Sequence, residues 1–240
     1  MLRLTIGSRV FAPRLWPTLL LVPVLGLLVG LGQWQLHRAN EKRSLQAAFA
    51  RGAETPVALP AVPTEAMRYV RVRAEGRYSG ERQFLLDNIT HEGVAGYRVV
   101  TPFEIDGGVL LLVDRGWIPV GTDRAQLPNV RVGERVRVVT GRLDLPPQAG
   151  MRLSAAAESG WPRRMSFPRL DALAQTLNRP LYPRLLLLDP GQPDGYVRDW
   201  QPGGMPPERH LGYAVQWFAL ALTLLVSFFV VNLRPAETRP

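Results

Sequence analysis

The chain has 240 residues with 28 arginines, a single lysine and a net charge of +9. It contains no cysteine, which excludes disulfides, thiolate metal sites and cysteine nucleophiles. In a soluble protein such a charge would favour nucleic acid as the partner. Two long apolar segments make anionic lipid headgroups the better candidate here, so we expect a membrane protein that binds no nucleic acid.

The first apolar segment follows a basic stretch. Residues 1–14 contain three arginines and no acid, and the 22 residues Leu15–Leu36 then contain no charged side chain. This length suffices to cross a hydrocarbon core of about 30 Å. A cleaved signal peptide would have a shorter apolar core with a small-x-small site directly behind it. We therefore expect an uncleaved transmembrane helix at residues 15–36.

Two glycines within this segment predict a packing face. Gly26 and Gly30 form a G-x-x-x-G motif, which lets the backbone of another helix approach closely. The C-terminal apolar helix is the natural partner for this face, and a helix of a different protein is the alternative. The polar, helix-prone residues 37–51 are expected to continue the first helix as a stalk.

The second apolar segment is His210–Leu233, which contains no charged residue after His210. We expect a transmembrane helix at residues 210–233. His210, Tyr213 and Trp217 stand at positions i, i+3 and i+7, so they share one helix face. That pattern is typical of the aromatic belt at a membrane surface, and a ligand-binding or partner-binding face is the alternative.

Two spans place both termini on one side of the membrane and residues 37–209 on the other. The short tails, 1–14 and 234–240, carry five arginines. Short basic segments favour the cytoplasmic side, whereas long domains translocate largely regardless of charge. We therefore predict two cytoplasmic tails and an extracytoplasmic domain at residues 37–209.

The middle of the chain has the period-two pattern of half-buried strands, as where Val70, Val72 and Ala74 alternate with charged residues. Asp106-Gly107-Gly108 is a hairpin signal. Further strands are predicted at Arg82–Asn88, Tyr97–Ile105, Val109–Ile118, Val130–Leu143 and Leu185–Leu188, and a helix at Arg169–Asn178. The predicted fold class is an α+β membrane protein, with two transmembrane helices flanking a small antiparallel β-barrel or sandwich that carries one or two helices.

The sequence contains none of the catalytic signatures that can be tested by spacing. There is no G-x-S-x-G, H-E-x-x-H, Walker loop or G-x-G-x-x-G. Glu104 and Asp106 flank a turn whose geometry explains them. We therefore predict no enzyme and no catalytic residue.

Three motifs resemble the Surfeit locus protein 1 family. The central one reads Gly93-x-x-Gly96-Tyr97-Arg98-Val99-Val100-Thr101-Pro102-Phe103, then Leu112-Val113-Asp114-Arg115-Gly116-Trp117-Ile118-Pro119. After the first span stands Gly32-x-Trp34-Gln35-x-x-Arg38-x-x-x-Lys42, and the second span opens with His210-Leu211-x-Tyr213-x-x-x-Trp217-Phe218. The chain departs from the family pattern at Arg209, where members often have Asn.

From these motifs we assign partner-binding or structural roles to ten residues besides Gly26 and Gly30. They are Gly32, Gln35, Arg38, Lys42, Tyr97, Pro102, Phe103, Arg115, Gly116 and Trp117. A glycine beside a tryptophan in a strand suits a bulge or a close backbone approach, so a structural corner is the favoured interpretation of Arg115-Gly116-Trp117.

The resemblance implies a non-enzymatic, membrane-anchored assembly factor for haem–copper cytochrome c oxidases. The family is implicated in delivering haem a to the oxidase core subunit, so that subunit, haem-handling proteins and membrane lipids are the expected partners. The resemblance makes His210 the candidate axial ligand of the haem iron. His37 is not part of the family pattern, but two antiparallel spans would place it near the same membrane surface, so it is an optional second ligand. Trp34, Tyr213 and Trp217 are then available to cover the porphyrin.

Two other functions remain open at this point. One is a membrane scaffold that binds the oxidase subunit without touching haem, and the other is a membrane-tethered enzyme with an unrecognised site. The rich use of Arg, Ala, Gly and Pro is typical of a GC-rich bacterial genome. We therefore expect a multi-pass protein of the bacterial inner membrane whose main domain is periplasmic.

Overall fold

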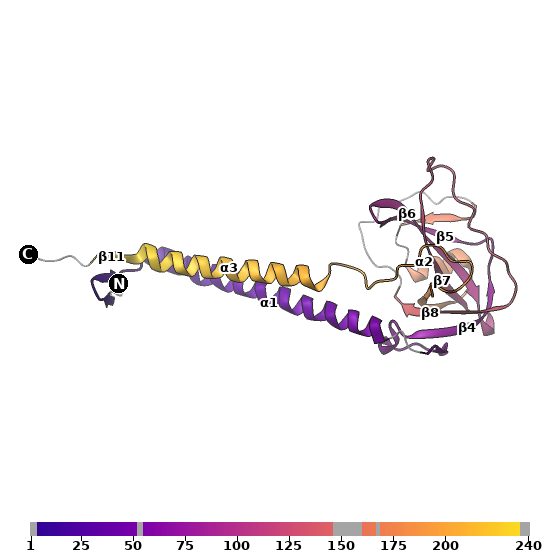
Figure 1. The fold of residues 1–240 in the computed structure, drawn as a ribbon, viewed down its shortest axis with the longest axis horizontal. Helices are drawn as coiled ribbons and strands as arrows, with labels where there is room; N and C mark the ends of the chain where they lie inside the picture. The colour runs from indigo at the N-terminus through magenta and orange to yellow at the C-terminus, as the bar shows by residue number, and fades with distance from the viewer. Residues whose placement is uncertain (1–3, 52–54, 146–159, 167–168, 236–240) are drawn as a thin grey trace, which may run out of the picture. The chain divides into compact units, whose positions relative to one another are not determined.

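The computed structural model describes residues 4–51, 55–145, 160–166 and 169–235 (Figure 1). The chain divides into two compact units. Met1–Ala47 and Pro202–Pro240 form the first, which contains two long helices, and Ala48–Gln201 form the second, which contains most of the strands.

The two long helices are α1 (Leu15–Arg51) and α3 (Pro207–Asn232). Both are long and apolar enough to cross a membrane, and their most apolar windows are only 6% and 11% buried. A core helix of a soluble protein would be mostly buried, so these apolar surfaces suit a lipid environment. The predicted helical continuation through residues 37–51 is confirmed, as is the fold class of two apolar helices flanking a small β domain.

A small sheet joins the two ends of the first unit, where the sequence predicted only basic tails. Strands β1 (Leu4–Ile6), β2 (Arg9–Phe11) and β11 (Leu233–Pro235) are antiparallel, with β2 in the centre. The Phe11 ring lies 5.4 Å from the ring of Phe229 on α3. This apolar contact holds the N-terminal hairpin against the end of α3.

Five strands of the second unit close into a barrel. They are β4 (Arg71–Tyr78), β8 (Arg137–Asp144), β10 (Leu181–Leu188), β7 (Leu110–Pro119) and β6 (Val94–Glu104), in that spatial order. Pairing of β4 with β6 closes the ring, so the predicted barrel is confirmed. Three further strands extend it, namely β3 (Val57–Ala58) beside β4, and β5 (Phe84–His91) with β9 (Arg163–Met165) beside β6.

The barrel is mixed rather than wholly antiparallel. Strands joined by short turns, such as β6 and β7 across Asp106–Gly108 (η2), are antiparallel, and the predicted hairpin is confirmed. β10 runs parallel to β7 because the chain between them first forms β8 and α2 (Leu170–Leu177). A second short 3₁₀ helix, η1 (Glu65–Met67), precedes β4.

One predicted strand is shorter than expected. The alternating pattern predicted a strand from Val130 to Leu143, but β8 covers only Arg137–Asp144. Val130 is buried outside the barrel, in a cluster with Leu85 and Tyr97. Its carbonyl accepts a hydrogen bond from Arg115 rather than from a neighbouring strand, so its burial reflects a loop contact.

Both faces of β7 and β10 are covered. Leu186 and Leu188 point into the barrel, whereas Leu185 and Leu187 pack in a second cluster with Leu173 of α2. A strand that is buried on both faces has a continuous apolar sequence, which explains the four consecutive leucines Leu185–Leu188.

Candidate functional site

The candidate site lies between α1 and α3, which pack through a seam of small and polar residues. Gly32 is buried on α1, and a Cβ atom built there would lie only 2.6 Å from the Phe218 ring of α3. The other buried residues of the seam are Gln35 and Ala39 on α1, and Pro207, His210, Ala214 and Ala221 on α3. Their spacings of three, four or seven residues keep one face of each helix in contact.

His210 and Gln35 meet within this seam. Nδ1 of His210 lies 2.7 Å from Oε1 of Gln35, and the two residues are only 8% and 9% exposed. An amide oxygen can only accept a hydrogen bond, so Nδ1 carries the proton. In the neutral imidazole Nε2 then holds the free lone pair, which is the state that a metal-ligating histidine requires.

The aromatic residues predicted to cover a ligand lie around this pair without contacting each other. Trp34 and Tyr213 are exposed, and Trp217 is half-buried. No ring contact joins these three among the residues that the structure describes. Their outward positions leave room for a flat apolar ligand or for lipid against the helix pair.

His37 does not share the face that holds Gln35. Residues at i and i+2 point to roughly opposite sides of a helix. The His37 side chain is 75% exposed, and its Nε2 lies 3.2 Å from a carboxylate oxygen of Glu41. His37, the optional second ligand, therefore does not lie beside His210 in this arrangement.

The polar residues after the first span also have defined contacts. Lys42 donates from Nζ to the Gly203 carbonyl across 3.0 Å, in the segment leading to α3. Gly204 lies against this ammonium, and a Cβ atom built there would be 2.6 Å from Nζ. Arg38 pairs with Glu41 at 2.6 Å on the exposed side of α1. Of these two motif residues, only Lys42 links the two chain segments.

The G-x-x-x-G motif does not pack against α3. Cβ atoms built at Gly26 or Gly30 would meet no atom within 4 Å. The close approach of the helices falls at Gly32 instead, because the bulky Phe218 lies over that residue. The expected packing of α3 on Gly26 and Gly30 is therefore wrong, and a helix of another protein remains the alternative for that face.

In the second unit, Arg115 is the centre of a buried polar network. Arg115 is 2% exposed, and its guanidinium donates four hydrogen bonds. The acceptors are the carbonyls of Asp194 (2.7 Å) and Val130 (2.8 Å), Oε1 of Gln83 (3.2 Å) and Oγ1 of Thr101 (3.3 Å). Burial lowers the pKa of Arg115 from its usual value. The network ties strands β6 and β7 to three loop residues, Gln83, Val130 and Asp194.

Asp114 is fully buried beside this network. Its carboxylate pairs with Arg98 at 2.5 Å and accepts a hydrogen bond from the Gly116 amide at 3.1 Å. Burial raises the pKa of Asp114 despite the nearby guanidinium. The Arg98 guanidinium also lies 4.7 Å from the Trp200 ring centroid, a cation–π contact.

Gly116 and Trp117 form the predicted close backbone approach. Gly116 has φ +114°, and a Cβ atom there would lie 2.6 Å from the Val197 carbonyl. The Trp117 amide donates to that same carbonyl at 2.8 Å, while its indole Nε1 donates to the Ile89 carbonyl at 2.9 Å. These contacts show the close backbone approach, and they suit the interpretation of Arg115-Gly116-Trp117 as a structural corner.

The remaining motif residues belong to the domain core. Tyr97 and Phe103 are fully buried, and the Pro102 carbonyl accepts a hydrogen bond from the Ser79 amide at 2.8 Å. Among the described residues no three His, Asp or Glu side chains gather in a metal-binding group. The central motif therefore builds the domain, and the polar chemistry of the terminal motifs meets on the helix pair.

Comparison with known proteins agrees with the order of these features. The profile of the SURF1 family matches residues 22–222, which include both ends of the helix seam and the barrel between them. This chain belongs to the SURF1 family. A SURF1-like protein of Monosiga brevicollis is 29% identical over 240 residues, covering 90% of this chain and 87% of the relative.

Bacterial SURF1-like proteins are also similar over most of their length. That of Rickettsia felis is 24% identical and covers 85% of this chain and 91% of the relative. That of Rickettsia conorii is also 24% identical and covers 87% and 88% respectively. The similarity to these SURF1 relatives therefore spans the helices as well as the barrel.

Proposed function

We propose that this chain is a non-enzymatic, membrane-anchored assembly factor for a haem–copper cytochrome c oxidase, and that it aids insertion of haem a into the core subunit. Support comes from its membership of the SURF1 family, which is known for oxidase assembly. The observation that carries the haem-handling part is the hydrogen bond between His210 and Gln35.

The donor set at this position fits a haem. Gln35 holds the Nδ1 proton, so Nε2 of His210 is the nitrogen that can bind iron. When bound, haem a would supply the redox-active iron centre that the oxidase needs, and the protein would supply one imidazole and an apolar surface. Trp217, Tyr213 and Trp34 offer that surface beside the helix pair.

We propose that His210 is the one ligand that this chain would supply to the haem iron. His37 forms its ion pair with Glu41 on the other side of α1, so it does not supply a second ligand beside His210. A single protein ligand suits a carrier that must release its cargo, because a haem held by two strong ligands dissociates less readily.

The test uses the full chain purified in detergent from cells that make haem a. We expect the wild type to show a haem a spectrum, and His210→Ala and His210→Gln to lose it. His37→Ala is the matched control and should retain the spectrum. Full haem occupancy in both His210 variants would show that the ligand assignment is wrong.

A second candidate function is a scaffold that binds the oxidase subunit through its membrane helices and never contacts haem. The open face at Gly26 and Gly30 favours it, because no part of the described chain packs there. Oxidase assembly that depends on the protein, with no haem bound even to the wild type, would support the scaffold. An oxidase level unchanged by the double variant Gly26→Leu, Gly30→Leu would argue against this face as the contact.

We also propose that the protein is a multi-pass protein of a bacterial inner membrane, with cytoplasmic tails and a periplasmic barrel. Support comes from the two apolar helices, the arginines of both tails and the bacterial relatives. Reporters fused after Pro240 and within residues 52–64 test it. A reporter that is active only in the cytoplasm should report from the first position alone.

A further inference from the structure

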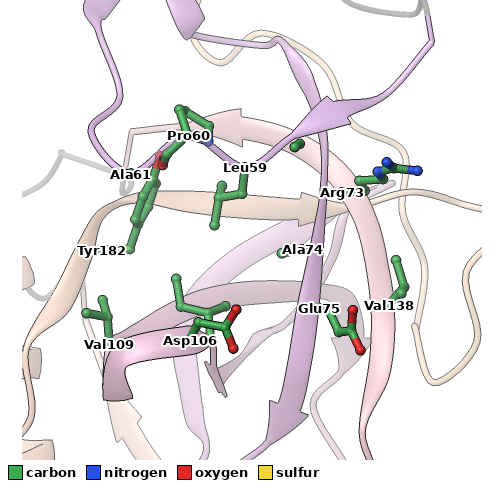
Figure 2. Close-up of a pocket in the computed structure, with 12 residues that line it drawn as sticks. Leu59, Pro60, Ala61, Arg73, Ala74, Glu75, Asp106, Val109, Val138 and Tyr182 are labelled. Carbon is green, nitrogen blue, oxygen red and sulfur yellow. The ribbon is translucent and has the colours of Figure 1, made fainter.

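The barrel domain contains a cavity that neither the helix-pair site nor the central motif uses. Its volume is about 710 Å³, which lies in the range of natural ligand sites. Figure 2 shows Leu59, Val109 and Tyr182 around its apolar part. Leu59 and Val109 pack against the buried core of the barrel, so the floor of this cavity is continuous with that core.

One edge of the cavity is an unpaired stretch of β4. On this edge β4 pairs with β3 through Val72 and Arg73, and with β6 through Arg77 and Tyr78. On this edge no described strand pairs with Ala74–Gly76, whose pairing with β8 uses the opposite edge of β4. The Leu59 amide bonds the Arg73 carbonyl, so Glu75, two residues further on, points its own amide and carbonyl toward the same edge. One main-chain donor and acceptor therefore face the gap.

The gap is short because β6 pairs with β4 again from Arg77 onward. A Cβ atom built at Gly76 would lie 2.1 Å from the Glu104 carbonyl oxygen, so the two backbones are in close contact there. Only the stretch around Ala74 and Glu75 is open. A bound chain could therefore pair with β4 over about one residue, with its two ends turning away from the sheet.

The rim of the cavity carries negative charge without partners. Glu75 and Asp106 lie within 4 Å of no basic side chain among the described residues. Eight other carboxylates in the described part of the domain have an arginine partner, as Glu104 does with Arg77 and Arg179. In Figure 2 the Asp106 carboxylate points toward β4, whereas the Arg73 guanidinium points away from Asp106.

We propose that this cavity binds a short extended peptide segment of a partner protein in which an apolar residue adjoins Lys or Arg. Residues opposite each other on paired strands share a face. Glu75 is exposed and Ala74 is buried, so the partner residue opposite Glu75 points outward beside the two carboxylates. Its neighbour points inward to the apolar floor. The free main-chain pair of Glu75 holds the segment in register.

Exposed valines on the rim support a protein partner. Val138, opposite Glu75 on β8, is 53% exposed and lines the cavity. Val57 and Val62, on either side of the lining residues Ala58–Ala61, are exposed as well. Apolar surface rimmed by charge is typical of an interaction site.

The test is a titration of full-length protein in nanodiscs, with ¹³C-labelled valine methyl groups as reporters. The probe is acetyl-Ala-Leu-Arg-Ala-amide. We expect saturable shifts at Val109 and Val138, and binding at least tenfold weaker for the same peptide with Glu in place of Arg. A fully N-methylated peptide, which cannot donate main-chain hydrogen bonds, should also bind at least tenfold more weakly.

Variants locate the binding. The pair Glu75→Gln and Asp106→Asn should weaken the arginine peptide at least tenfold. Glu92→Gln with Asp199→Asn removes the same charge at exposed positions outside the cavity and should change nothing. Equal binding of the Glu peptide, or no effect of the cavity variants, overturns the proposal. So does hexylammonium that binds as tightly as the peptide, since that result would indicate a site for small cations.

Discussion

His210 on α3 donates a hydrogen bond from Nδ1 to Oε1 of Gln35 on α1 across 2.7 Å, and both residues are almost fully buried. The contact joins positions 175 residues apart in sequence, one from each terminal motif. The same hydrogen bond joins the two helices and determines which imidazole nitrogen of His210 is free to bind a metal.

The first prediction concerns that selection. Gln35→Leu removes the acceptor, so His210 should no longer be confined to the tautomer protonated at Nδ1. ¹⁵N NMR of the imidazole in haem-free protein measures this directly. The wild type should show the Nδ1–H form, and Gln35→Leu should show a mixture or the opposite form.

Gln35→Glu is the matched variant, because a carboxylate still accepts from Nδ1. It should keep the Nδ1–H form and retain haem where Gln35→Leu loses it. Loss of the hydrogen bond should cost the helix pair only about 1 kcal/mol, as is usual for polar contacts in membranes. A wild-type imidazole protonated at Nε2 would contradict the role assigned to Gln35.

The second prediction separates the glycines of α1. Gly32→Leu places a side chain against the Phe218 ring and should force α1 and α3 apart, whereas a Cβ atom at Gly30 meets no atom within 4 Å, so Gly30→Leu should be accommodated. The chain has no native cysteine, so Gln35→Cys with His210→Cys supplies a single thiol pair. Disulfide yield between them should fall several-fold with Gly32→Leu and stay unchanged with Gly30→Leu.

Much of the barrel could be predicted from the sequence because its cues are local. The alternation before and within β4, the Asp-Gly-Gly turn and the spacing of α2 each lie within a dozen residues. Strand order is not local. The parallel contact of β10 with β7 depends on which strands meet after a long connection, and no pattern in either strand specifies it.

The functional residues show the same contrast between local sequence cues and long-range contacts. Spacing placed His210, Tyr213 and Trp217 on one helix face, but it could not identify Gln35 as the partner of His210. The acceptors of Arg115 are equally dispersed, on segments 14 to 79 residues away. A G-x-x-x-G motif likewise indicates only that another helix can approach closely. The position of Phe218 decided that the approach occurs at Gly32.

The third prediction tests whether Arg115 is structural. Arg115→Met leaves the Asp194 and Val130 carbonyls without their guanidinium donor in a buried setting. We expect the free energy of unfolding to fall by about 3 kcal/mol or more. Arg77→Met is the control, since its exposed ion pair with Glu104 should contribute under about 1 kcal/mol. Denaturant unfolding followed by tryptophan fluorescence compares them.

Haem binding by the same variant tests whether Arg115, in the barrel unit, also contributes to the site on the helix pair. If Arg115 acts only on the fold, Arg115→Met protein that remains folded in mild conditions should bind haem as the wild type does. A variant of normal stability that loses haem would instead place Arg115 in the binding machinery.

The last prediction is the alkaline limit of the barrel. Burial raises the pKa of Tyr78 to about 12, and its hydroxyl has no hydrogen-bond partner among the described residues. The folded state therefore holds this proton more tightly than the unfolded chain, whose tyrosine pKa is about 10. Below pH 10 the resulting stability is fully present, and it is lost as the pH rises from 10 to 12. The loss attributable to Tyr78 should approach about 3 kcal/mol, since two pKa units correspond to that free energy. Tyr78→Phe removes the titrating group and leaves no polar partner unpaired, so it should unfold like the wild type at pH 8 and resist alkali better. Unfolding curves of both proteins between pH 8 and pH 12 measure the difference, and parallel curves would show that Tyr78 does not titrate as a buried group.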